Sequence, residues 1–157
     1  MRIGIFYATK HGCTEKCVHK LKQDMSGEIE LINLKNKATA RIEKYDTVLI
    51  GGSIHAGRVQ RSIQKFCNIH LGSLLRKKIG LFICCMESGA KAEEQLKNAF
   101  PQELLNHAKA KGCFGGAFDF DKMNFIEKVI IKKVASIDQS VSKISEESIQ
   151  KFITEIQ

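Results

Sequence analysis

Apolar runs alternate with amphipathic stretches along most of the chain. Residues 2–8 form a nearly continuous apolar run, and similar runs cover 29–34, 47–53, 79–85 and 113–119. Short apolar runs of this kind are typical of strands that are buried on both faces of a parallel sheet. The pattern therefore predicts five strands.

Segments with helical periodicity separate these runs. Apolar residues recur at helical spacing in the segments 14–25, 59–67, 91–99, 123–137 and 146–156. Pro101 suits the first turn of a further helix, and Ser145 suits the cap of the last one. Alternating strands and helices predict an α/β fold, with a parallel sheet covered by helices on both faces and ligands at the carboxyl ends of its strands.

Length and composition favour one globular domain over residues 1–157. The chain has 157 residues, of which 43% are hydrophobic. No apolar run approaches the ~20 residues of a membrane-spanning helix, and the chain enters its first strand without a basic, signal-like segment. The six cysteines contain no Cys-x-x-Cys pair. We expect a cytoplasmic protein whose cysteines stay reduced.

The charge balance is strongly basic, with 25 lysines and arginines against 17 acids and a net charge of +8. Such a balance favours an anionic partner, which could be a membrane surface, an acidic small molecule or a nucleic acid. The alternative for any single lysine is a solvated helix face. Aromatic residues make up only 7% of the chain and no nucleic-acid motif is present, so we do not expect nucleic-acid binding.

The loop after the first strand is the clearest chemical signal. It lies between a buried strand and a helix and reads Thr9, Lys10, His11, Gly12, Cys13, Thr14. Such a loop presents hydroxyls, backbone N–H groups and a helix N-terminus to one point, as a phosphate requires. The alternative is an ordinary turn in which Cys13 or Thr14 only begins the helix.

This loop resembles the phosphate loop of flavodoxin-like FMN proteins, whose pattern is hydroxyl-x-hydroxyl-Gly-x-hydroxyl. Thr9, Gly12 and Thr14 match that pattern, and His11 replaces the middle hydroxyl. The resemblance covers nearly the whole chain. It implies a three-layer sandwich with strand order 2-1-3-4-5 and FMN as cofactor, with its phosphate held by residues 9–14.

The resemblance also implies that two further loops hold the isoalloxazine ring. They follow the third and fourth strands and comprise Ser53, Ile54, His55, Ala56, Gly57, Met86, Glu87, Ser88 and Gly89. His55 would lie near the N5 and O4 edge of the flavin, which makes it the candidate catalytic residue. The alternative is a surface histidine in a loop.

Within this superfamily, the chain is most similar to the menaquinone-dependent protoporphyrinogen oxidases. The similarity rests on residues 45–57 and on 115–118 with the basic helix after them. It implies an FMN-dependent oxidoreductase that uses a quinone and a porphyrinogen. That group has an aromatic residue near the position of Ala56, which this chain lacks. The alternatives are an electron carrier that docks on a redox partner protein, and a basic interaction module without flavin.

The segment 122–137 predicts an amphipathic helix with one anomaly. Lys133 falls inside its apolar arc, whereas Lys128 and Lys132 lie outside it. A lysine there can extend its ammonium to lipid headgroups, so we expect peripheral contact with an anionic membrane at its inner face. The alternative, a helix packed on the core, fits the pattern equally well.

Cys13 and Cys17 are one helical turn apart, as in some metal sites. No histidine or acid completes a ligand set in the sequence pattern, so we expect no metal.

Overall fold

A five-stranded parallel sheet forms the centre of the molecule. The computed structural model describes residues 1–35, 40–118, 141–142 and 144–157. The strands lie in the order β2-β1-β3-β4-β5, and every neighbouring pair is parallel. Their bounds are β1 (Arg2–Tyr7), β2 (Glu28–Asn33), β3 (Thr47–Ser53), β4 (Lys78–Cys84) and β5 (Ala110–Cys113). The predicted fold class and strand order are confirmed.

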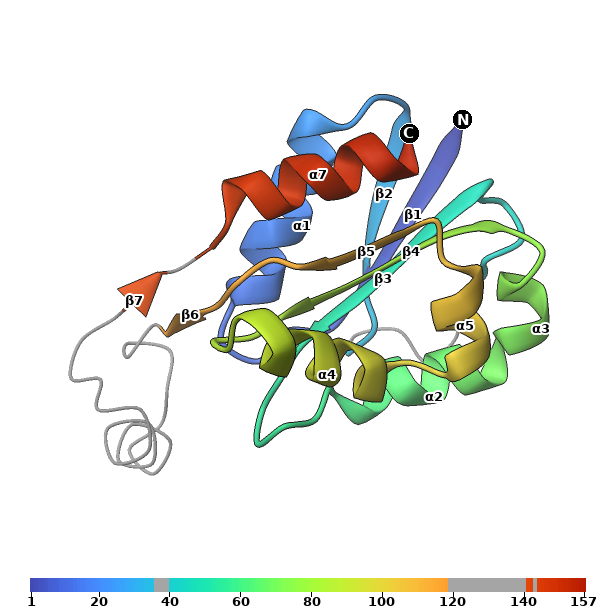
Figure 1. Cartoon of the computed structure of the whole chain (residues 1–157). Coiled ribbons are helices and arrows are strands. Elements are labelled where there is room, and N and C mark those ends of the chain that lie inside the picture. The colour runs from blue at the N-terminus through green and yellow to red at the C-terminus, as the bar shows by residue number, and fades with distance from the viewer. Residues whose placement is uncertain (36–39, 119–140, 143) are drawn as a thin grey trace.

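Helices cover both faces of this sheet (Figure 1). One face carries α1 (Cys13–Asp24) and α7 (Glu146–Ile156). The other face carries α2 (Arg61–Ile69), α3 (Leu71–Leu74), α4 (Gly89–Ala99) and α5 (Gln102–His107). The arrangement is the predicted three-layer sandwich.

Each face of the sheet has its own apolar core, because successive side chains of a strand point to opposite faces. Beneath α7, Phe82 stacks on Phe114 with 4.9 Å between the ring centroids, and Phe152 meets both rings edge-on. Gly51 makes room for the Phe82 ring, since a Cβ there would overlap it. Cys84 and Cys85 lie in opposite cores, as the strand pattern predicts.

Among the described residues, the fifth strand is misplaced by the sequence. A strand over 113–119 is wrong: β5 ends at Cys113. Gly115 has a φ of +83°, which breaks the extended backbone. Residues Ala117–Phe118 form β6 instead, which pairs antiparallel with β7 (Val141–Ser142).

The last helix begins as predicted. The Ser145 side chain accepts a hydrogen bond from the Ser148 amide (3.2 Å), and the apolar stripe of α7 is buried. The helix predicted over 123–137 lies outside the described residues. Among the described residues, every helix is too short or too polar to cross a membrane.

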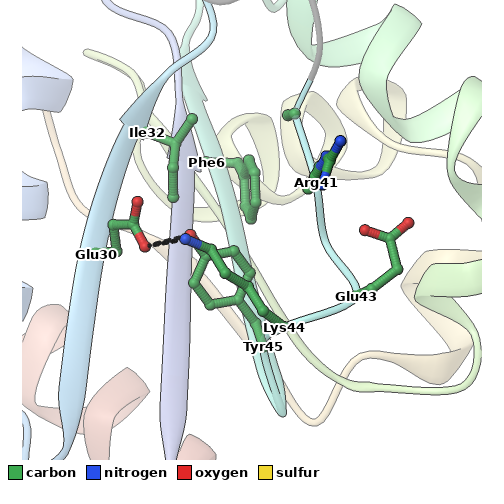
Figure 2. A pocket seen from close by; sticks show the side chains of 8 residues that line it. Phe6, Glu30, Ile32, Arg41, Glu43, Lys44 and Tyr45 are labelled. Atoms are coloured by element: carbon green, nitrogen blue, oxygen red, sulfur yellow. Dashed lines mark hydrogen bonds and ion pairs between the residues drawn. The ribbon is translucent and has the colours of Figure 1, made fainter.

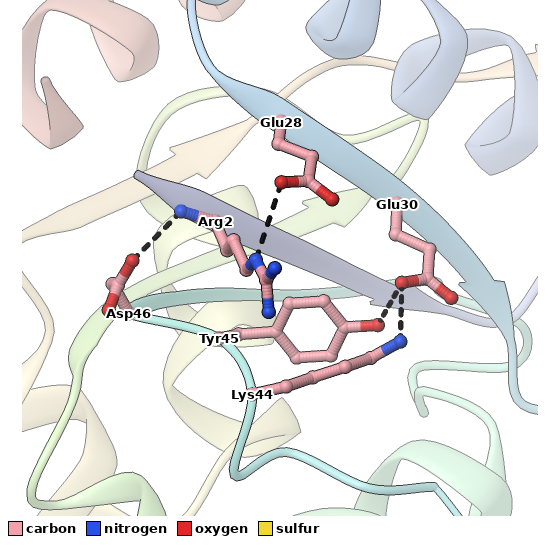
Figure 3. A network of polar contacts seen from close by, with 6 residues as sticks. All are labelled: Arg2, Glu28, Glu30, Lys44, Tyr45 and Asp46. Atoms are coloured by element: carbon pink, nitrogen blue, oxygen red, sulfur yellow. Dashed lines mark hydrogen bonds and ion pairs between the residues drawn. The ribbon is translucent and has the colours of Figure 1, made fainter.

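A polar network fastens the segment before β3 to the edge of the sheet (Figure 3). The Tyr45 hydroxyl donates to Glu30 of β2 over 2.6 Å, and the Lys44 ammonium contacts the same carboxylate at 2.8 Å. The hydrogen bond and charge of Glu30 raise the pKa of Lys44. At the amino end of β1, the Arg2 amide donates to Asp46 over 2.8 Å.

Candidate flavin site

Three loops meet at the carboxyl edge of the sheet because β1, β3 and β4 are neighbours. The register pairs Tyr7 with Gly51 and Ser53 with Cys84, so the strands end at nearly the same level. Segments 8–14, 53–58 and 85–89 therefore leave the sheet side by side. They contain all of the predicted site residues.

The first loop turns into α1 through Gly12. This glycine has a φ of 86°, in the left-handed region, and precedes the first residue of the helix. Its amide donates to the Thr9 hydroxyl over 3.0 Å, which leaves the Thr9 proton available for a second partner. Among the described residues no side chain caps α1, and the first amides of a helix have no partner within it. The turn thus presents amides 13–15 and the Thr9 hydroxyl together.

Thr14 carries the most telling feature of this loop. Its side chain is fully buried, and its hydroxyl has no hydrogen-bond partner among the described residues. A buried hydroxyl left unsatisfied costs about 1–3 kcal/mol, so native structures rarely retain one without a use. An oxygen acceptor at the helix N-terminus, such as a phosphate oxygen, would satisfy it.

The second loop is a tight two-residue turn. The His55 amide donates to the Arg58 carbonyl over 2.8 Å, and the Arg58 amide returns a bond of 3.1 Å. The two central residues, Ala56 and Gly57, have φ values of 51° and 77°. Positive φ at both central positions is the signature of a type I′ turn. The turn lifts exposed Ala56 and Gly57 above the edge of the sheet.

A residue absent from the sequence prediction, Gln60, orders the base of this turn. Its amide nitrogen donates to the Ser53 hydroxyl over 2.6 Å, and its oxygen accepts from the Ser53 amide over 3.0 Å. The Ser53 hydroxyl lies 3.0 Å from Nε2 of His55. Since the Ser53 hydroxyl accepts a hydrogen bond from Gln60, its proton can be donated to Nε2 of His55. This hydrogen bond orients the His55 ring.

His11 and His55 join the first two loops. Their rings meet edge to face, with 5.4 Å between the centroids and an interplanar angle of 82°. Both side chains are half-buried, whereas Lys10 is exposed. The structure therefore brings together two histidines that are 44 positions apart in the sequence.

The third loop continues from β4 into α4. The Ile54 amide donates to the Cys84 carbonyl over 2.9 Å, which connects the second loop to the start of the third. Gly116 packs beneath the loop, since a Cβ there would meet the sulfur of Met86. Glu87, Ser88 and Gly89 are exposed, and Gly89 has a φ of 60°.

A cavity of about 1050 Å³ opens beside this third loop. It runs from Met86–Gly89 over the end of β5 towards α7, where Lys151 lines it. Cys85 and Cys113 also line it; a hydrogen bond from Cys113 lowers the pKa of the Cys85 thiol. The cavity has mixed polar and apolar walls and lies next to one predicted flavin loop.

A second cavity, of about 780 Å³, lies away from these loops (Figure 2). It is lined by Phe6 and Ile32 at its apolar base and by Glu30, Arg41 and Lys44 at its rim. The Tyr45–Glu30 bond closes one side. None of the predicted site residues is among its lining residues. Glu30, Lys44 and Tyr45, which line it, form the polar network at the edge of the sheet.

The fold defines a class: a doubly wound α/β protein with the strand order β2-β1-β3-β4-β5. The sequence matches the flavodoxin-domain family over residues 4–145. The chain belongs to this family. Among curated proteins, none matches the sequence significantly.

Solved structures with the same fold share little sequence with the chain. A short-chain flavodoxin associated with a PDU bacterial microcompartment is 13% identical, with a TM-score of 0.62 over 99% of this chain and 96% of that one. The FMN-bound flavodoxin of Fusobacterium nucleatum is 19% identical, with a TM-score of 0.51 over 99% and 96%.

A larger protein contains a similar domain. The rubredoxin:oxygen oxidoreductase of Desulfovibrio gigas is 13% identical, with a TM-score of 0.58. The match covers 99% of this chain but only 35% of that one, so this chain spans about a third of it. These likenesses show the fold. The family match agrees with the predicted cofactor.

Proposed function

We propose that this chain binds FMN at the three loops and transfers electrons through it. The observation that carries the proposal is the buried Thr14 hydroxyl without a partner among the described residues, beside an uncapped helix N-terminus. A phosphate supplies acceptor oxygens for that hydroxyl, for Thr9 and for the first amides of α1. The membership of the flavodoxin-domain family supports the same cofactor.

The residues of each loop have separate roles in this proposal. Thr9, Thr14 and amides 13–15 bind the phosphate, and Lys10 adds positive charge. Ile54, His55 and the turn at Ala56–Gly57 would hold the isoalloxazine from one loop, and Met86–Gly89 would hold it from the other. Bound FMN supplies one- and two-electron chemistry. The protein would position the ring and exclude water, and His55 is the candidate hydrogen-bonding partner of the ring.

An electron carrier and an enzyme with its own substrate both fit this site. A carrier docks on a redox partner protein at the exposed loops. An oxidase similar to the menaquinone-linked group would also need room for a substrate, and the cavity beside Met86–Gly89 offers it. We therefore keep a quinone-linked oxidoreductase acting on a porphyrinogen as the second candidate.

The experiment is to reconstitute the purified chain with FMN and record its visible spectrum and turnover. A one-to-one yellow complex supports the proposal, and a colourless protein that takes up no FMN rejects it. Oxidation of a porphyrinogen at the expense of a quinone selects the oxidase. Electron exchange with a partner protein but no turnover selects the carrier.

Membrane contact through 122–137 is a separate hypothesis, which rests on the sequence because this segment lies outside the described residues. Co-sedimentation with anionic and neutral vesicles at low and high salt tests it. A Lys128/Lys132/Lys133-to-Gln variant should lose binding. If the unmodified chain ignores anionic vesicles at low salt, the hypothesis fails.

A further inference from the structure

Three buried thiols meet beneath the phosphate loop. Cys13 is the first residue of α1, Cys17 lies one turn further on, and Cys84 ends β4. Their sulfur atoms all lie within 4.8 Å of one another, and those of Cys17 and Cys84 are 3.6 Å apart. The sequence suggests only the helical pair. The parallel register of the sheet supplies the third sulfur.

The surroundings of this triad are apolar. Its three side chains are between 0% and 6% exposed and belong to the core between the sheet and α1 and α7. Val18 and Leu21 of α1 and Phe114 pack in the same core. Among the described residues, no histidine or carboxylate joins the three sulfurs as a further ligand. Within the described part of the chain, the site therefore offers sulfur ligands alone, in an apolar setting.

This donor set has a definite metal preference. Thiolate ligands select soft ions such as Cu(I) and Zn²⁺. Zn²⁺ takes four ligands in nearly all structural sites, which this triad does not provide. An ion at the centre of three sulfurs, with metal–sulfur bonds of about 2.3 Å, needs sulfur–sulfur edges of about 4 Å. The Cys17–Cys84 distance of 3.6 Å, and the limit of 4.8 Å within which all three sulfurs lie, are compatible with that value.

We infer that Cys13, Cys17 and Cys84 form a three-coordinate site for a soft monovalent metal ion, Cu(I). Binding exchanges the three thiol protons for one cation, with no change of oxidation state. The resulting complex carries two negative charges, and the positive end of the α1 dipole at Cys13 stabilises them. The inference is independent of flavin, since it rests only on the thiols.

The test is an anaerobic titration of the reduced chain with Cu(I) against a chromophoric Cu(I) chelator. We expect one tightly held copper per chain, a near-ultraviolet sulfur-to-copper absorption, and three sulfur neighbours by X-ray absorption. Cys17→Ala should weaken binding by at least about a hundredfold, because loss of even an outer-shell partner costs 10- to 100-fold. Cys84→Ala should do the same.

Two controls make the result decisive. Cys67→Ala removes a buried thiol from the core on the opposite face of the sheet. Cys113→Ala removes one thiol of the neighbouring Cys85–Cys113 pair. Both variants should retain full copper affinity, and circular dichroism checks the fold of each. The inference is overturned if the unmodified chain holds copper no more tightly than the Cys13/Cys17/Cys84-to-Ala variant. It is also overturned if copper binding depends on Cys113, or if Zn²⁺ displaces Cu(I).

Discussion

Replacing Thr14 by valine should lower FMN affinity and leave the flavin-free protein at least as stable. Valine has nearly the same shape as threonine and lacks the hydroxyl. The Thr14 hydroxyl is buried without a partner among the described residues, so its removal abolishes an unsatisfied polar group. Such a group costs about 1–3 kcal/mol, and its loss raises the free energy of unfolding of the apoprotein. The two effects have opposite signs.

The expected loss of affinity follows from the charge of the phosphate. A hydrogen bond to a charged group contributes about 1.5–3 kcal/mol. This free energy corresponds to a rise in Kd of roughly 10- to 150-fold. Thr14→Glu should abolish binding altogether, since it adds bulk and a negative charge where the phosphate lies.

The assay is quenching of FMN fluorescence on titration with apoprotein, together with thermal unfolding of each variant without flavin. Thr47→Val is the matched control, because Thr47 is also buried but begins β3 at the opposite end of the sheet. It should leave FMN affinity unchanged. Undiminished FMN affinity in Thr14→Val would refute the reasoning, and so would an apoprotein that is less stable than the unmodified one.

Three further predictions follow from the described residues. Gly57→Ala should lower the free energy of unfolding by about 1 kcal/mol in a denaturant titration, because the φ of this residue is +77° and no atom lies near the added Cβ to compensate the strain. Gly72→Ala is the control, since Gly72 has equal space and no positive φ, and it should be neutral or stabilising. Tyr45→Phe should cost about 1 kcal/mol of stability through the lost 2.6 Å bond to Glu30, and this loss should vanish in a Glu30→Ala background, which has no side-chain acceptor. The net charge of +8 should make the potential of bound flavin less negative than in an acidic flavodoxin, and Arg58→Glu should shift it to more negative values in a redox titration at low salt; a very negative potential in the unmodified chain would contradict this.

The central strands were predictable because burial on both faces leaves only apolar residues. The run 47–53 coincides with β3, and the last helix was predictable because Ser145 caps an uninterrupted apolar stripe. The fifth strand was misplaced for a physical reason. β5 is a four-residue edge strand that contains exposed Lys111, so its pattern does not resemble a buried run. The apolar residues after Cys113 fit a strand pattern instead, although the backbone turns at Gly115.

The candidate site shows the same division between local and distant information. The loop at residues 9–14 could be singled out as a candidate phosphate site because Thr9, Gly12 and Thr14 lie within six consecutive positions. The contact of His11 with His55 and the third sulfur at Cys84 depend on the register of neighbouring strands. No spacing along the chain reveals such a register. Gln60 had a weak signal, as a polar residue just before α2 whose amide can reach back to the strand end.

The central claim is that the loop at residues 9–14 holds the phosphate of FMN. Its most direct test compares the affinity of the apoprotein for FMN with that for riboflavin, which has the same ring and no phosphate. We predict that FMN binds at least about 100-fold more tightly, because two or more hydrogen bonds to a charged group are lost with riboflavin. Equal affinity for the two flavins would show that the loop does not bind the phosphate, and would contradict the account.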